Sequence, residues 1–223
     1  MQDDLAGKST TLARRPLKTR GAAWPKAVAQ LFIRAGLVPN QISVLSMIFS
    51  GLAAACFLLA AGRQPLAGAI LLLAAAGMIQ LRLLCNLVDG LMAIEGGLKS
   101  KVGDLFNDLP DRISDAVTLL SVGYSLSWTW GPVMGWLATV TAILTAYIRV
   151  LGGSAGTTQY FIGPMAKQQR MGLLTVACVL AAGERMFFTG ERVFPLALIL
   201  IVIGSLITAW RRLRRIAGDL NSS

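Results

Sequence analysis

The residues best suited to chemistry lie between positions 86 and 115. The segment reads NLVDGLMAIEGGLKSKVGDLFNDLPDRISD and holds six of the eleven acidic residues. A charged side chain at the centre of a bilayer costs about 2.5–3.5 kcal/mol on the insertion scale. Because long apolar segments flank this stretch, its acids cannot all face lipid. They must face a wet cavity, pair with cations or lie at the edge of a membrane.

Two spacings in this segment place oxygen atoms on shared helix faces. Asn86 and Asp89 are three residues apart, and Asn107 and Asp111 are four apart. Residues at these spacings are neighbours on a helix surface, so each pair shares one face. The chain has no histidine, and its three cysteines are scattered. Carboxylate and amide oxygens alone suit a hard cation such as Mg²⁺, Mn²⁺ or Ca²⁺.

Other residues of the segment have both a functional and a plain structural interpretation. Gly90 follows Asp89 directly, and its missing side chain lets a ligand or a neighbouring backbone come close. Asp104 and Asp115, each considered alone, fit a structural interpretation, in which they belong to a solvated, acidic helix start. Acidic side chains near a helix N-terminus are stabilised by the helix dipole. Asp108 can likewise pair with Arg112 on the next turn.

Composition sets the class of protein. Of 223 residues, 55% are hydrophobic and only 14% are charged, and the formal net charge is +10. Soluble domains carry roughly 25% charged residues, so an ordinary cytosolic protein is excluded, and the lack of histidine excludes Ser-His-Asp triads and HExxH zinc sites. Because the basic residues flank apolar segments, we expect anionic lipid head groups as their partners and no nucleic acid.

The elements that would position these residues are transmembrane helices. We expect an all-α polytopic membrane protein with six spans, preceded by an interfacial amphipathic helix over 24–36 with Val28, Leu31, Phe32 and Ala35 on one face. The fifth apolar stretch has only twelve residues and needs its flanking turns to cross. The spans are expected at 42–61, 66–89, 102–126, 133–148, 171–182 and 193–210, with a loop at 151–169.

Six spans place both termini on one side of the membrane. That side would carry 15 Lys and Arg residues, and the other only Arg63, Arg185 and Arg192. The positive-inside rule therefore predicts cytoplasmic termini, in what we expect is a bacterial inner membrane. The expected organisation is a cytoplasmic leader over 1–37, a six-helix domain over 38–215 and a short tail over 216–223. A GxxxG at Gly131 and Gly135 could pack helices or a homodimer.

The segment resembles the signature of the CDP-alcohol phosphatidyltransferase family, D-x2-D-G-x2-A-R-x8-G-x3-D-x3-D. The resemblance covers roughly residues 38–215 and includes PNQIS at 39–43, which is similar to the family's PNxIT entry to its first span. Every spacing of the signature is kept, as Asn86-x2-Asp89-Gly90-x2-Ala93-Ile94-x8-Gly103-x3-Asn107-x3-Asp111.

The resemblance implies a reaction and assigns roles to these positions. It implies transfer of a phosphatidyl or other substituted phosphate group from a CDP-linked donor, such as CDP-diacylglycerol, to an alcohol, with release of CMP. One or two Mg²⁺ or Mn²⁺ ions would hold the pyrophosphate. Asp89 and Asp111 would be the catalytic carboxylates, with Asp111 the candidate base. The implied metal ligands are Asn86, Asp89, Asn107, Asp108 and Asp111, and the implied nucleotide pocket is Gly90, Ala93 and Gly103.

Three positions depart from the signature. Asn86 and Asn107 stand where the family has aspartate, and Ile94 stands where it has arginine. Asparagine offers one neutral oxygen instead of a charged one, so affinity for a second cation should fall, although the adjacent Asp108 could restore charge. The departures leave an alternative open, a noncatalytic CDP-lipid or divalent-cation-binding membrane protein that has kept the fold.

Basic residues further along the chain could recognise a phosphate. Arg149, Lys167 and Arg170 lie on the expected cytoplasmic side. They could bind a phosphate on the acceptor or on the lipid, as similar residues do in family members with phosphorylated acceptors. The structural alternative is that they are ordinary positive-inside residues.

Overall fold

All secondary structure in the described residues is helical. The computed structural model describes residues 23–95 and 103–222, without the side chains of residues 94, 95, 103, 104, 106 and 107. The helices in these ranges are α1 (Ala23–Arg34), α2 (Pro39–Ala60), α3 (Pro65–Glu95), α4 (Gly103–Tyr124), α5 (Gly131–Ser154), α6 (Lys167–Phe187) and α7 (Val193–Ser222). The expected all-α class is confirmed.

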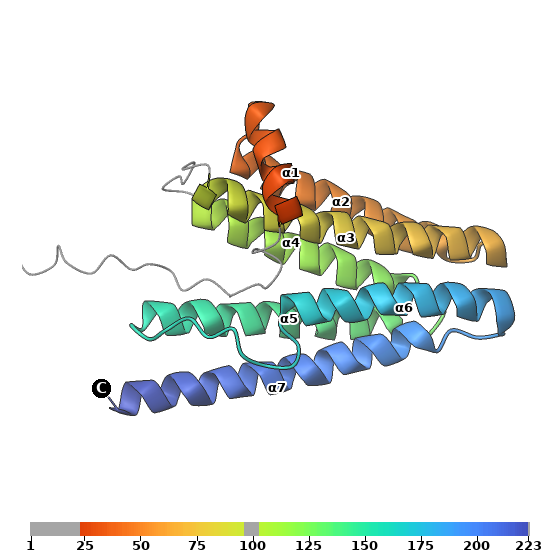
Figure 1. Cartoon of the computed structure of the whole chain (residues 1–223). Helices are drawn as coiled ribbons and strands as arrows, with labels where there is room; N and C mark the ends of the chain where they lie inside the picture. The colour runs from red at the N-terminus through yellow and green to blue at the C-terminus, as the bar shows by residue number, and fades with distance from the viewer. Residues whose placement is uncertain (1–22, 96–102, 223) are drawn as a thin grey trace, which may run out of the picture.

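Helices α2 to α7 lie side by side, and α1 stands steeply against the α2 and α3 side of the bundle, where it packs on α3 (Figure 1). The end of α7 lies at the left end of the bundle in this view. Helix α3 packs against α2 and α6, while α4 packs against α2 and α5, and α5 packs against α7. Neighbouring antiparallel helices joined by short turns, such as Ala61–Gln64 between α2 and α3, produce this arrangement.

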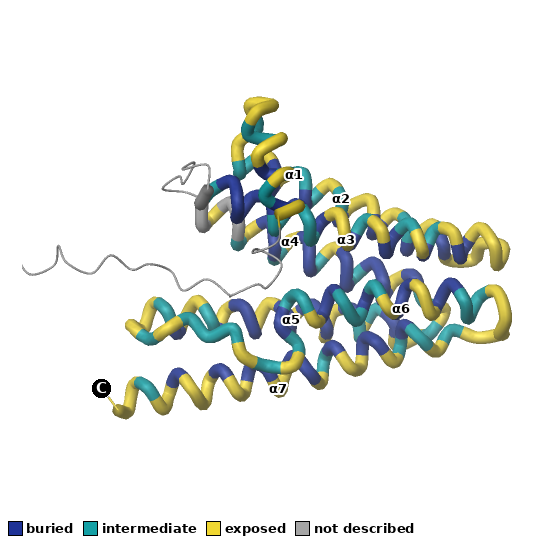
Figure 2. The backbone as a smooth tube through the Cα atoms, viewed as in Figure 1, coloured by how far each residue is buried: buried dark blue, intermediate teal, exposed yellow. Residues whose placement is uncertain are grey.

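Four of the helices are long and apolar enough to cross a membrane by length and composition. They are α2, the Pro65–Ala93 part of α3, α5 and α7. Their outward faces are exposed while their inward faces are buried (Figure 2). Helices α4 and α6 also lie in the bundle but carry buried charges, such as Asp115 and Arg170, that lower their mean hydropathy.

Several helices are longer than the sequence expectation, including α3, which continues to Glu95. Helix α6 begins at Lys167 and has 21 residues instead of twelve, and α5 continues to Ser154, so the expected loop at 151–169 is shorter. Helix α7 continues through the expected tail to Ser222. Its extension is packed, because Ile216 is buried against Ile148 and Ala209.

A helix, α1, occupies the place of the expected amphipathic helix, and part of the expected apolar face packs against α3. In α1, Ala29 is buried, and Val28 and Phe32 pack with it against α3. Leu31 of the expected apolar face is 63% exposed. The face that α1 turns to the bundle therefore shares Val28 and Phe32 with the expected stripe, and the interfacial position stays a prediction. Residues 1–22 of the expected leader lie outside the described residues.

The GxxxG glycines pack inside the chain, between α4 and α5. A Cβ atom on Gly123 would lie 2.6 Å from the carbonyl oxygen of Gly131 and 2.8 Å from the Cα atom of Gly135. Such distances leave no room for a side chain, so only glycine lets the two backbones approach this closely. The motif therefore serves helix packing here, and the homodimer stays a prediction.

This contact predicts a loss of stability in Gly123→Ala. The added methyl group must push two backbones apart, which we expect to lower the free energy of unfolding by about 1–3 kcal/mol. Thermal unfolding in detergent would measure it. Gly183→Ala is the matched control, because a methyl group on this helical glycine would have no described atom within 4 Å and alanine is the better helix former. Equal melting temperatures for the two variants would contradict the contact.

Candidate active site

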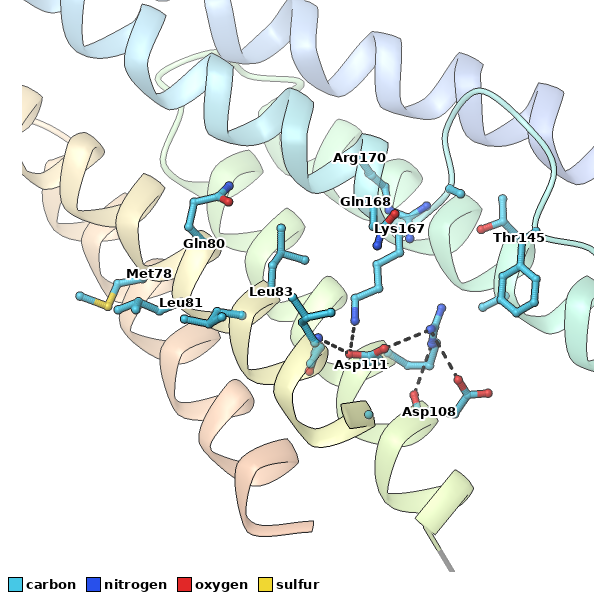
Figure 3. A pocket seen from close by; sticks show the side chains of 18 of the residues that line it. Met78, Gln80, Leu81, Leu83, Asp108, Asp111, Thr145, Lys167, Gln168 and Arg170 are labelled. Carbon is cyan, nitrogen blue, oxygen red and sulfur yellow. Dashed lines mark hydrogen bonds and ion pairs between the residues drawn. The ribbon is translucent and has the colours of Figure 1, made fainter. Parts of the chain in front are cut away.

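A cavity of about 1060 Å³ opens between α3, α4, α5 and α6, with Trp24 of α1 also in its wall. One part of its wall is polar and charged, and includes Asp108, Asp111, Arg149 and Lys167 (Figure 3). The other part is an apolar strip of α3 that runs away from these charges. The strip consists of Ala74, Gly77, Met78, Leu81 and Leu84.

Asp111 is the centre of the polar part. Its Oδ1 atom accepts hydrogen bonds from the Lys167 ammonium at 2.5 Å and from the Asn86 amide at 2.9 Å. The Lys167 side chain reaches down from α6 to Asp111 on α4 (Figure 3). The Oδ2 atom of Asp111 lies 3.9 Å from a guanidinium nitrogen of Arg112, beyond hydrogen-bond distance. Residues from three helices therefore meet at one carboxylate.

Asp89 lies beside the cavity and is buried. Its Oδ2 atom accepts a 2.6 Å hydrogen bond from the Ser43 hydroxyl, which reaches across from α2. Its Oδ1 atom is buried and has no hydrogen-bond partner among the described residues. An unpaired buried carboxylate oxygen is costly, so this atom is suited to a ligand that supplies positive charge.

Asp108 is held by Arg149 from the facing helix α5. One guanidinium nitrogen lies 2.8 and 2.9 Å from the two carboxylate oxygens. The same guanidinium lies 5.2 Å from the centre of the Phe161 ring, a cation–π contact. The expected pairing with Arg112 is looser, at 3.9 Å. In this structure Asp108 is engaged by Arg149, and its role as a metal ligand stays a proposal.

A buried ion cluster lies behind Asp111. Asp115 contacts Arg82 at 2.5 Å through Oδ1 and Arg170 at 2.7 Å through Oδ2. Arg82 also donates to the carbonyl oxygen of Asp111, and Arg170 to that of Met165. All three charged side chains are almost fully buried. The interpretation of Asp115 as part of a solvated helix start was wrong, because the carboxylate faces the bundle and holds two arginines.

The remaining predicted site residues have three different outcomes. Gly90 and Arg170 line the cavity, but the Arg170 guanidinium is engaged by Asp115. Ala93 is not among the described lining residues. The surroundings of Gly103 and the side chain of Asn107 lie outside what the structure describes, although both positions are helical in α4.

Three residues of the site were missed from the sequence. Ser43 donates to Asp89, Arg82 pairs with Asp115, and Arg212 of α7 lines the cavity. Arg212 donates to the carbonyl oxygens of Thr145 and Ile162. Arg82 had a signal, because an arginine inside an apolar span requires a partner. Ser43 and Arg212 resemble ordinary span-end residues in the sequence.

The donor set fits a hard divalent cation. The unpartnered Oδ1 of Asp89, the carboxylate of Asp111 and the amide oxygen of Asn86 are ligands that such cations accept. Among the described residues, no group of three or more His, Cys, Asp or Glu side chains lies close enough together to hold a metal. The described part of the site therefore offers two carboxylates and one amide.

Comparison with known proteins gives distant relatives along most of the chain. The chain is 27% identical over 169 residues to the archaetidylinositol phosphate synthase of Pyrococcus horikoshii. The match covers 76% of this chain and 79% of the relative. It is 26% identical over 205 residues to an uncharacterized protein of Aquifex aeolicus, with 91% and 93% of the two chains covered. No protein-family model matches the chain.

Solved structures share the fold. The phosphatidylinositol phosphate synthase of Mycobacterium tuberculosis with CDP-DAG bound superposes with a TM-score of 0.72 at 20% identity, covering 87% of this chain and 94% of that one. Its complex with manganese and citrate gives 0.70 at 20% identity, covering 86% and 88%. The chain thus has the fold of the CDP-alcohol phosphatidyltransferases, and the resemblance indicated by its motif is confirmed.

The ion cluster predicts a large loss of stability in Asp115→Asn. This substitution removes the carboxylate that contacts both buried arginines and leaves Arg82 with only the more distant Asp111, at 3.9 Å, which we expect to cost about 3–5 kcal/mol of unfolding free energy. Asp108→Asn is the matched control, because this carboxylate is half-exposed and loss of its pairing with Arg149 should cost at most about 1 kcal/mol. Urea or thermal unfolding in detergent would compare them. A similar loss in both variants would contradict the assigned role of the cluster.

Proposed function

We propose that the protein is a membrane transferase of phospholipid synthesis. It moves a substituted phosphate group from a CDP-linked lipid to an alcohol and releases CMP. The observation that carries the proposal is the cavity, whose charged part around Asp111 adjoins an apolar strip of α3. A CDP-linked lipid has the same division into a charged head and an apolar tail. The relatives of known activity are synthases of inositol phosphate lipids.

The acceptor in this proposal is a phosphorylated polyol, of the inositol phosphate kind that the relatives' names describe. Its phosphate would approach Arg149 and Lys167, which line the cavity from α5 and α6. Arg170 also lines the cavity, so its positive charge would lie near the phosphate. Its guanidinium is already paired with Asp115. A guanidinium binds phosphate oxygens through paired hydrogen bonds, and Phe161 beneath Arg149 holds its plane in place.

Asp111 is the proposed base. Its Oδ1 atom is occupied by Lys167 and Asn86, so Oδ2 is the oxygen that would take the proton of the acceptor hydroxyl. Asp89, Asp111 and Asn86, with Asn107 from the sequence, would hold a divalent cation, Mg²⁺ or Mn²⁺. When bound, such an ion neutralises phosphate charge and favours departure of the CMP group. Gly90 leaves room beside these residues for the nucleotide.

The proposed arrangement in the membrane has six spans, α2 to α7. Helices α4 and α6 would cross as part of the bundle, with their charges turned toward the other helices. The positive-inside rule then places both termini in the cytoplasm and the cavity at the cytoplasmic face of a bacterial inner membrane. Helix α1 would lie along that interface, and the proposal includes a homodimer.

Removal of either carboxylate should abolish the reaction. We expect Asp111→Ala and Asp89→Ala to lower CMP release from CDP-diacylglycerol at least about 100-fold, because each loses a base or a cation ligand. Chelation of divalent ions should do the same in the wild type, with recovery on adding Mn²⁺. Glu191→Gln, at an Arg185 ion pair remote from the cavity, is the control. Undiminished activity of both alanine variants would overturn the mechanism, and tight CDP-lipid binding without CMP release would favour the noncatalytic alternative.

Arg149 should determine the affinity for a phosphorylated acceptor. Arg149→Gln removes a charge-assisted contact, so we expect the KM for inositol phosphate to rise by about 10- to 100-fold. The KM for CDP-diacylglycerol should change far less. Initial rates of CMP release over a grid of both substrates would separate the two constants. An equal rise in both would assign Arg149 to the donor.

A further inference from the structure

We propose that Lys167 is a built-in cation of the site, so that the protein holds one divalent ion and uses the Lys167 ammonium for the remaining positive charge. This inference rests on the proposed function, because the phosphates that the Lys167 charge would meet are those of the proposed substrates. The first argument is the contact itself. The ammonium lies 2.5 Å from Asp111 Oδ1, close to where a metal ion would bind that oxygen.

The Asn86 amide points to the same conclusion. Its Nδ2 group donates to Asp111 Oδ1 at 2.9 Å. An aspartate at position 86 would bring a second carboxylate against that oxygen and would need a cation between them. With asparagine the contact is already favourable. Asn86 and Lys167 together therefore give Asp111 Oδ1 the positive surroundings that a second ion would otherwise supply.

The charge balance around the cavity argues against a second ion. The described acidic residues of the cavity and the ion cluster behind it are Asp89, Asp108, Asp111 and Asp115. The described basic residues are Arg82, Arg112, Arg149, Lys167, Arg170 and Arg212. Basic residues thus outnumber acidic ones by two within this set. Within this described set, a second divalent ion would add to an existing excess of positive charge.

The placement of Lys167 is not explained by its own helix. It is the first residue of α6, where the helix dipole favours an acidic side chain. A lysine at this end is locally unfavourable. The side chain reaches from α6 to α4 and ends on Asp111, so the carboxylate accounts for the position (Figure 3).

The test counts Mn²⁺ ions without substrate, by the electron paramagnetic resonance signal of free Mn²⁺ in titrations of the purified full chain. We expect one ion per wild-type chain. Lys167→Met should tighten Mn²⁺ binding at least about tenfold by removing the competing charge. Lys167→Arg keeps the charge and should stay near the wild-type affinity. The double variant Asn86→Asp/Lys167→Met should bind two ions.

Arg149→Met is the matched control, because it removes one positive charge from the same cavity but frees Asp108 instead of Asp111. It should tighten Mn²⁺ binding by less than about threefold. Elution as a single species with a wild-type melting curve would show that each variant is folded. Two ions on the wild type, none, or equal tightening in Lys167→Met and Arg149→Met would overturn the inference. Because no substrate is present, this result is separate from any failure of CMP release.

Discussion

Burial of charge between helices is the constraint on which the site depends. A carboxylate and two guanidiniums are costly to remove from water, and they are tolerated only when each satisfies the others. Asp115 meets the charges of Arg82 and Arg170 through its two oxygens, at 2.5 and 2.7 Å, and the Nε atoms of the two arginines are buried without a hydrogen-bond partner among the described residues. The three side chains come from α4, α3 and α6. The cluster therefore fixes how these three helices sit against one another.

The functional residues lie one helical turn from the members of this cluster. Asn86 follows Arg82 by four residues, Asp111 precedes Asp115 by four, and Lys167 precedes Arg170 by three. Residues at these spacings lie one above the other on a helix. The contact among Asn86, Asp111 and Lys167 is therefore the next layer of the same three-helix junction. This layering also accounts for the low mean hydropathy of α4 and α6, because each of these helices contributes charged side chains to both layers.

The sequence was informative where one segment contained the pattern. The spacing of Asn86, Asp89 and Asp111 predicted two oxygen-bearing faces, and the structure brings Asn86 and Asp111 into contact. The partners of Arg82 could not be predicted, because Asp115 and Arg170 belong to other helices. The start of α6 was missed for a related reason. The expected span was placed by its apolar residues, and Lys167 is charged. Its partner Asp111 lies far away in the sequence, so the apolar pattern could not indicate that the helix begins at Lys167.

The glycine contact between α4 and α5 bears on the width of the cavity. Gly123 touches α5 near one end of the pair, whereas Asp108 and Arg149 bridge the helices towards the other. Fifteen residues of helix separate Gly123 from Asp108, a length of roughly 22 Å at about 1.5 Å per residue. The backbones of α4 and α5 are thus held together at the glycine contact, whereas side chains connect them near Asp108 and Arg149. By geometry, a small change in the angle between the two helices at the glycine contact gives a larger change in their separation at the cavity.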